Sequence, residues 1–158
     1  MWQKIRPYVI SVLIALGVGA LSAVWTKDSM ESYNNINQPA LAPPMILFPI
    51  VWSVLFILMG ISSAIVWIKR GEYPDDAMSA LRIYGLQLVV NFFWSIIFFN
   101  MQAYLFAFIW IILLLALIVT MIVQFKKISP LAAYLQIPYA LWVTFAGYLT
   151  LMIYLLNR

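Results

Sequence analysis

The chain contains neither histidine nor cysteine, and charged residues make up only 9% of it. Without imidazole or thiolate groups it lacks the usual general bases and nucleophiles, as well as the common ligands of zinc and haem iron. No metal site is therefore expected. The five carboxylates all fall in predicted loops, and they are Asp28, Glu31, Glu72, Asp75 and Asp76. An ion-coupled transporter or pump keeps ionisable side chains within its spans, so proton-coupled transport is disfavoured.

What the chain has in excess is apolar sequence, at 66% of the residues with a mean hydropathy of +1.00. Such a composition leaves too little polar surface for a soluble globule. The longest uncharged runs are apolar on every side and do not alternate with period two, which favours helices over barrel strands. A spanning helix needs about 20 apolar residues. The sequence therefore predicts an all-α membrane protein, a bundle of five transmembrane helices in a single domain, with spans near residues 6–25, 44–69, 77–99, 104–125 and 130–156.

The basic residues are distributed unevenly between the two sides of these spans. Only Lys27 and Arg158 fall on the C-terminal side, whereas the N-terminal side has Lys4, Arg6, Lys69, Arg70, Arg82, Lys126 and Lys127. Because Lys and Arg are in excess on the cytoplasmic face, we expect a cytoplasmic N-terminus and an external C-terminus. Helical spans favour a bacterial inner membrane over an outer one. No basic aqueous face indicates nucleic-acid binding. The first span also resembles a signal peptide, although its apolar stretch is long for one.

Aromatic residues recur within the second, third and fifth predicted spans, at intervals of three or four residues that place them on one helix face. The stripes are Pro44, Phe48, Trp52 and Phe56; Gln87, Asn91, Trp94 and Phe98; and Pro138, Trp142 and Ala146. Such stripes are commonly core packing, and amides within membranes commonly bond to other helices. A deeply placed indole, however, needs a partner for its N–H or a ligand to stack on. The stripes therefore also fit a mostly apolar small-molecule cavity, with Asn91 as a donor to the ligand.

The same segments resemble the TspO/MBR family, the tryptophan-rich sensory and translocator proteins related to the peripheral benzodiazepine receptor. The similarity runs from the first span to the C-terminus. The matching positions are Pro39, Pro43, Pro44, Phe48, Trp52 and Gly60; Gln87, Asn91, Trp94, Phe98 and Phe99; and Pro138, Tyr139, Trp142, Phe145, Ala146 and Leu149. Two positions depart from the family pattern, because Leu41 replaces a common aromatic residue and Thr150 a common asparagine. Leu41 affects what can be expected at the entrance of the pocket. Thr150 removes an amide from the fifth span, so ligand preference is expected to differ from that of relatives.

The resemblance implies a five-helix bundle, often a homodimer, that binds porphyrins such as protoporphyrin IX and haem, and synthetic isoquinoline carboxamides. It implies a membrane receptor or sensor, most similar to bacterial members, that requires no cofactor. Trp52 and Trp142 would flank a flat macrocycle. The expected ligand-binding residues are Tyr33, Pro44, Phe48, Trp52, Phe56, Asn91, Trp94, Trp142, Phe145, Ala146 and Leu149. The polar loop 27–43 is long for a membrane hairpin, so we expect a lid over the pocket, although a linker would have the same length.

Two other functions stay open at this point. Bacterial members of the family have been associated with light- and oxygen-driven porphyrin degradation, in which Trp52 and Trp142 would be catalytic through indole radicals. Transport of tetrapyrroles or sterols would require a path for the ligand, which neither periodicity nor charge indicates. A sterol-type motif can be assigned to Leu149, Tyr154 and Arg158, but this pattern has little specificity in an apolar helix that ends in a basic residue.

Overall fold

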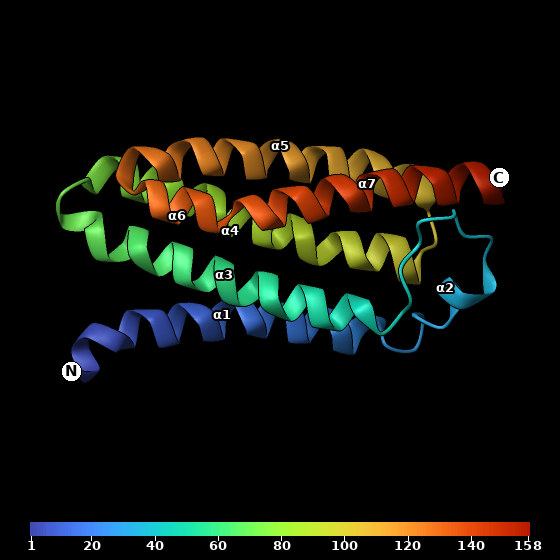
Figure 1. Ribbon diagram of the computed structural model, residues 1–158, viewed down its shortest axis with the longest axis horizontal. Helices are drawn as coiled ribbons and strands as arrows, with labels where there is room; N and C mark the ends of the chain where they lie inside the picture. Colours follow the sequence, from blue (N-terminus) through green and yellow to red (C-terminus); the bar gives the residue numbers. More distant parts are fainter.

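The computed structural model describes residues 1–158 as a bundle of helices without strands. Five segments are long and apolar enough to cross a membrane, and they run side by side along the long axis (Figure 1). They are α1 (Trp2–Thr26), α3 (Leu47–Ile68), α4 (Pro74–Ser95), α5 (Tyr104–Ile128), and α6 (Pro130–Leu135) followed by α7 (Ile137–Asn157). The prediction of an all-α bundle of five transmembrane helices is confirmed. Since the number of spans is odd, the two termini lie at opposite ends (Figure 1).

The helix ends differ from the sequence-based boundaries by a few residues, and α4 shows why. It begins at Pro74, within the segment predicted as a loop, because proline suits a first helical turn and Asp75 and Asp76 complement the helix dipole. At its other end α4 continues into a π-helical turn at Ile96–Asn100, where the Met101 N–H donates to Ile96 O at 3.0 Å. Hydropathy alone does not predict such a turn.

The fifth span is interrupted near its start. Gln136 separates α6 from α7, and Pro138 in the first turn of α7 has no backbone N–H to continue the ladder of α6. The short α6 packs on α5 and α3, and the Ser62 hydroxyl of α3 donates to Ala132 O at 2.6 Å. The last span therefore contacts both α3 and α5 through α6, and mainly α5 through α7.

Helix α1 packs mainly on α3, and the two backbones approach closely at Gly60. A methyl group added to Gly60 would lie 2.5 Å from the Cα atom of Val12. Small residues at membrane helix contacts permit this kind of approach. The outer face of α1 is exposed and apolar, with Leu13, Leu21 and Val24 among its exposed side chains. That face is suited to lipid.

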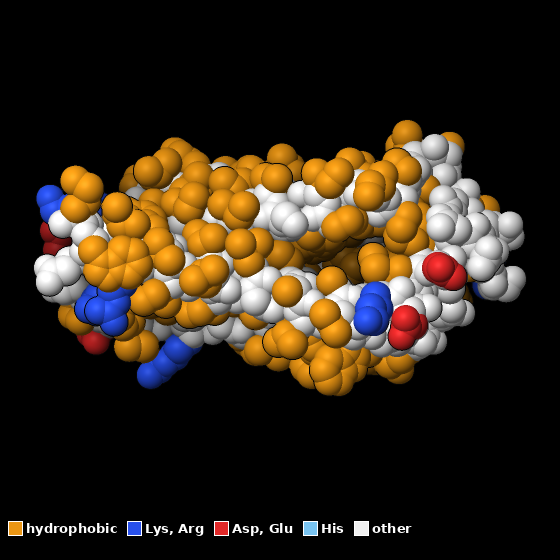
Figure 2. Space-filling view, turned by 90° about the horizontal axis from the view of Figure 1, so that it is seen from below, with side chains coloured by type: hydrophobic (Ala, Val, Ile, Leu, Met, Phe, Trp, Pro, Cys, Tyr) orange, Lys and Arg blue, Asp and Glu red, His pale blue; other side chains and the backbone are white.

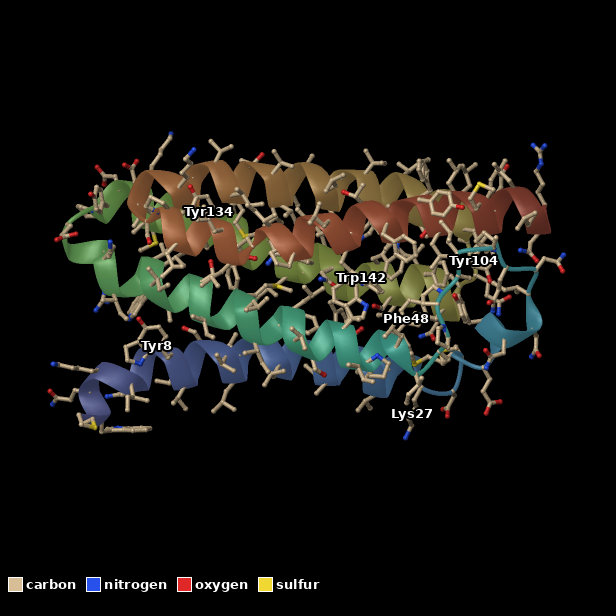
Figure 3. All side chains as sticks on the ribbon, viewed as in Figure 1. Tyr8, Lys27, Phe48, Tyr104, Tyr134 and Trp142 are labelled. Atoms are coloured by element: carbon tan, nitrogen blue, oxygen red, sulfur yellow. The ribbon has the colours of Figure 1, made fainter.

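Charge is concentrated at the two ends of the bundle, and hydrophobic side chains cover much of the surface between them (Figure 2). Lys27 lies at the end that also carries the C-terminus (Figure 3). This end is covered by the loop 27–43, which contains the short helix α2 (Ser32–Asn35). The other end carries the N-terminus and most of the basic residues, in agreement with the alternation of the five spans.

Candidate functional site

A cavity of about 400 Å³ lies between α1, α3 and α4, in the half of the bundle nearer to the loop 27–43. Small residues of α1 form one wall, and aromatic residues of α3 and α4 form the others. The lining residues are Leu16, Gly19, Ala20, Ser22, Ala23, Thr26, Met30, Phe48, Pro49, Trp52, Ser53, Phe56, Asn91, Trp94, Ser95 and Phe99. The volume lies within the range of about 300–1,000 Å³ that is typical of small-molecule sites.

The cavity opens through the side of the bundle. Ala20 and Ala23 line it and are also exposed on the surface of α1. Figure 2 shows a hollow on this face, toward the end that carries the loop. Both alanines lie in the last two turns of α1, a candidate membrane span, so the opening lies near the end of the bundle that carries the loop.

Five of the residues predicted to bind ligand line this cavity, namely Phe48, Trp52, Phe56, Asn91 and Trp94. They come from the stripes of the second and third spans, as the helical spacing predicted. The Trp52 and Phe56 rings lie 5.7 Å apart between centroids, one turn from each other on α3. The structure thus assembles the α3 and α4 parts of the predicted site.

The other six predicted residues lie outside the cavity lining, and they are Tyr33, Pro44, Trp142, Phe145, Ala146 and Leu149. Trp142 of α7 lies beside Phe48, with ring centroids 6.2 Å apart (Figure 3). Phe48 thus lies between Trp142 and the cavity, and no α7 residue is among the lining. Whether Trp52 and Trp142 flank a bound macrocycle stays a prediction. Phe145 packs in turn on Trp142, at 5.5 Å between centroids.

A buried hydrogen-bond network joins α4 to α7. The Asn91 amide nitrogen donates to the Tyr139 hydroxyl at 2.7 Å, and that hydroxyl donates to Gln87 Oε1 at 2.5 Å. Asn91 was expected to donate to a ligand, but the structure directs this amide nitrogen to Tyr139, since polar groups inside a membrane protein need internal partners. The side-chain carbonyl oxygen of Asn91 is still able to accept a hydrogen bond from a ligand.

Replacement of Tyr139 by phenylalanine is expected to lower the free energy of unfolding by about 1 kcal/mol, because Asn91 and Gln87 both lose their shared partner. Thermal unfolding followed by circular dichroism in detergent would measure the change. The matched control is Tyr134→Phe, whose ring is exposed and whose hydroxyl makes no comparable network. Equal midpoints for the two variants would contradict a stabilising role for the network.

Trp94 brings an unused donor to the cavity. Its indole ring stacks on Phe98 with centroids 5.0 Å apart, and its Nε1 atom is buried without a hydrogen-bond partner. A buried N–H that stays unpaired is costly, so an acceptor on a bound ligand would gain from meeting it. The polar residues among the mostly apolar lining are Asn91, Ser22, Thr26, Ser53 and Ser95.

The loop 27–43 is fastened across the end of the bundle. The Tyr33 side chain is 1% exposed, its hydroxyl donates to Pro43 O at 3.0 Å, and its ring meets the edge of Phe48 at 5.2 Å between centroids. The Gln38 side-chain amide donates to the backbone oxygen of Tyr33. Asn157 at the end of α7 donates from its side chain to Asn37 O at 2.8 Å. Met30 from this loop lines the cavity, which fits the expected role as a lid.

The Tyr33 anchor is expected to loosen at high pH. Burial raises the pKa of Tyr33 to about 12 from its ordinary value of 10.0, so the fold favours the neutral hydroxyl. Its contribution to stability is complete below pH 10 and is lost as pH rises through about 12. Hydrogen exchange of the loop amides would increase across that window. Tyr33→Phe, which cannot ionise, is the control, and an identical increase in this variant would contradict the assignment.

Sequence patterns missed the α1 wall of the cavity. Gly19 and Ala23 lie four residues apart, a spacing that indicated close helix packing and nothing more specific. In the structure a methyl group on Gly19 would lie 2.6 Å from the Phe56 ring, so this glycine provides space for an aromatic residue of α3. Ser95 and Phe99, at and within the π-helical turn, were missed too. No sequence signal marks that turn.

The chain is similar to known proteins over almost its whole length. Residues 10–156 match the TspO/MBR family. The chain is 34% identical to the tryptophan-rich protein TspO of Chlorobaculum tepidum, across 99% of both proteins, and 35% identical to the protein of the same name from Archaeoglobus fulgidus, across 98% of this chain and 99% of the relative. It is 29% identical to the translocator protein of Bos taurus, across 88% of this chain and 82% of the relative. Together with its five spanning helices, these similarities show that the chain is an integral membrane protein of the TspO/MBR family.

Proposed function

We propose that this protein is a membrane receptor that binds porphyrins, such as protoporphyrin IX and haem, and isoquinoline carboxamide-type ligands in the cavity between α1, α3 and α4. The observation that carries the proposal is the cavity itself, which is mostly apolar, opens at the side of the bundle and is lined by the rings of Trp52, Phe56 and Trp94. Flat aromatic ligands partition into lipid and stack on rings such as those of Trp52 and Phe56. Burial and stacking then supply most of the affinity, and Trp94 and Asn91 orient the ligand.

We further propose that the protein lies in a bacterial cell membrane with its N-terminus in the cytoplasm. The excess of basic residues at the N-terminal end of the bundle supports this orientation. The loop 27–43 would then cover the external end, and it would shield the cavity from water on that side. Fusion of a reporter that is active only in the cytoplasm to each terminus tests the orientation, and activity at the C-terminus alone would contradict it.

The porphyrin proposal is tested by titrating the purified protein with protoporphyrin IX in the dark while tryptophan fluorescence is recorded. We expect saturable quenching, because Trp52 and Trp94 line the cavity. An isoquinoline carboxamide should compete and restore the fluorescence. The matched control is a mixture of free tryptophan and pigment in the same detergent. Quenching that rises without saturation, as in that mixture, would contradict the proposed cavity.

The same titration under illumination distinguishes a receptor from a porphyrin-degrading enzyme. A receptor leaves the porphyrin absorption bands unchanged. If the bands disappear in light and oxygen, and persist in a Trp52→Phe variant that still binds, the protein is an enzyme that uses this indole. Trp142→Phe is the comparison, because Trp142 lies outside the cavity lining. Loss of degradation in both variants would indicate electron transfer through both indoles.

A further inference from the structure

A second recess, of about 670 Å³, lies between α1, α3 and α4 at the opposite end of the bundle, which carries the N-terminus and most of the basic residues. It shares no lining residue with the cavity of about 400 Å³. The family resemblance, the aromatic stripes and the proposed receptor function leave it unexplained. Its lining has polar residues at both the mouth and the floor, which is unusual within an apolar bundle.

Two arginines stand at the mouth of this recess. Arg6 comes from the start of α1 and Arg70 from the 3₁₀ turn Lys69–Gly71 that follows α3. The Arg70 guanidinium lies 3.8 Å above the Trp67 ring and donates to Trp67 O at 2.7 Å, so its position is fixed. No carboxylate is among the lining residues. Two guanidinium groups in a lining that has no carboxylate favour an anion, and phosphate matches their fork of donors well.

The floor of the recess contains two neighbouring hydroxyl groups, those of Tyr84 and Ser63. Tyr84 is 7% exposed, and its OH is buried without a hydrogen-bond partner. Its ring stacks on Phe125 with centroids 6.3 Å apart, which fixes the side chain. Ser63 also lines the floor, and its hydroxyl donates to Gly60 O at 3.1 Å. Within the chain the only group near enough to accept from the Tyr84 OH is the Ser63 hydroxyl, and the two do not form a hydrogen bond of ordinary geometry, so a carbonyl oxygen of a ligand would be a better acceptor.

The distance from mouth to floor matches the upper part of a phospholipid. Ser63 lies seven residues before Arg70, about 10 Å along a helix, and Ser11 lies five residues after Arg6, about 7.5 Å. The phosphate of a glycerophospholipid is followed at a similar depth by its ester carbonyls and then by its acyl chains. Apolar side chains of Ile10, Ile14 and Leu81 complete the walls.

We propose that this recess binds one anionic glycerophospholipid from the leaflet at the N-terminal end of the bundle. Its phosphate lies between Arg6 and Arg70, an ester carbonyl accepts a hydrogen bond from Tyr84, and an acyl chain lies along Ile10 and Ile14. A free phosphate ion would satisfy only the arginines. The cytoplasmic leaflet of cells is rich in anionic lipids, and basic residues near it gain affinity for them.

Native mass spectrometry of the protein in micelles with equal amounts of phosphatidylglycerol and phosphatidylcholine, of the same acyl chains, tests the proposal. We expect one retained lipid per chain, with about a tenfold preference for phosphatidylglycerol. The R6Q/R70Q variant should lose this preference. The control K126Q/K127Q removes the same charge from the same end, outside the recess, and should keep it. An unchanged preference in R6Q/R70Q, or an equal loss in the control, would overturn the proposal.

The floor is tested separately with Tyr84→Phe, which removes a hydroxyl that forms no hydrogen bond of ordinary geometry in the chain and should therefore change the thermal unfolding midpoint little. We expect about threefold less retention of both lipids and an unchanged ratio between them. Full retention would overturn the placement of the ester carbonyl. Millimolar inorganic phosphate should leave the unfolding midpoint unchanged, whereas phosphatidylglycerol should raise it. Equal stabilisation by the two would overturn the lipid in favour of a simple anion site.

Discussion

Replacement of Gly60 by alanine is expected to destabilise the bundle by about 3 kcal/mol, the upper part of the range for overpacking. The added methyl group would lie 2.5 Å from Val12 Cα, a backbone atom that cannot rotate away, so α1 and α3 must separate. Thermal unfolding followed by circular dichroism in detergent measures the effect. Thiol-reactive dyes are unsuitable because the chain has no cysteine.

Two other glycines provide the controls for this prediction. A methyl group on Gly17 or on Gly85 would meet no atom within 4 Å. Alanine is favoured over glycine in a helix by about 0.8–1.0 kcal/mol, so Gly17→Ala and Gly85→Ala should unfold at or above the midpoint of the unmodified protein. A midpoint for Gly60→Ala equal to those of the controls would show that α1 and α3 do not approach as closely as described.

The contact at Gly60 also organises the two recesses. On α1 the lipid recess extends as far as Ile14 and the ligand cavity begins at Leu16. On α3 the ligand cavity ends at Phe56 and the lipid recess begins at Ser63, with Gly60 between them. Helix α1 therefore contacts α3 closely at Gly60 and Val12, and again where Gly19 meets Phe56. A change at this crossing would alter both sites together.

The number and type of the helices could be predicted because they depend on properties that are visible along the sequence, namely the length of apolar runs and the positions of charges and prolines. Apolar length decided the spans, and charge and proline marked their ends. The errors arose where local chemistry competed with hydropathy. Pro74 and the acids after it start α4 inside an apparent loop, and the π-helical turn at Ile96–Asn100 extends it beyond Ser95.

The shared faces of the helices could be predicted from the sequence, whereas the partners of those faces could not. Helical spacing shows which residues share a face, so Phe48, Trp52 and Phe56 were correctly grouped, as were Asn91 and Trp94. Spacing does not show which helix that face meets. The α7 stripe was expected on the opposite wall, but small residues of α1 provide that wall instead. Alanine and glycine carry no distinctive chemistry, so their contribution becomes visible only when Gly19 is seen against Phe56.

Replacement of Ala20 by phenylalanine is expected to weaken the binding of protoporphyrin IX by at least about a hundredfold. Ala20 lines the cavity at its opening on α1, and a phenyl ring there would occupy much of a volume of about 400 Å³. A ring that blocks a close-packed site removes both stacking and burial, which are the main sources of affinity. Fluorescence titration of the purified variant in the dark measures the loss. Since Ala20 is exposed, the protein should keep its unfolding midpoint.

The control for this substitution is Leu21→Phe, because Leu21 is the next residue, is 56% exposed and lies outside the cavity lining. It adds an aromatic ring at the same membrane depth and should leave the affinity unchanged. Trp142→Phe completes the comparison, since it tests the α7 wall that the sequence predicted. If ligand binds between α1, α3 and α4, Ala20→Phe abolishes binding and Trp142→Phe preserves it. The opposite result would place the ligand between α3 and α7, beside Phe48, and would require that ring to move away from Trp142 when ligand binds.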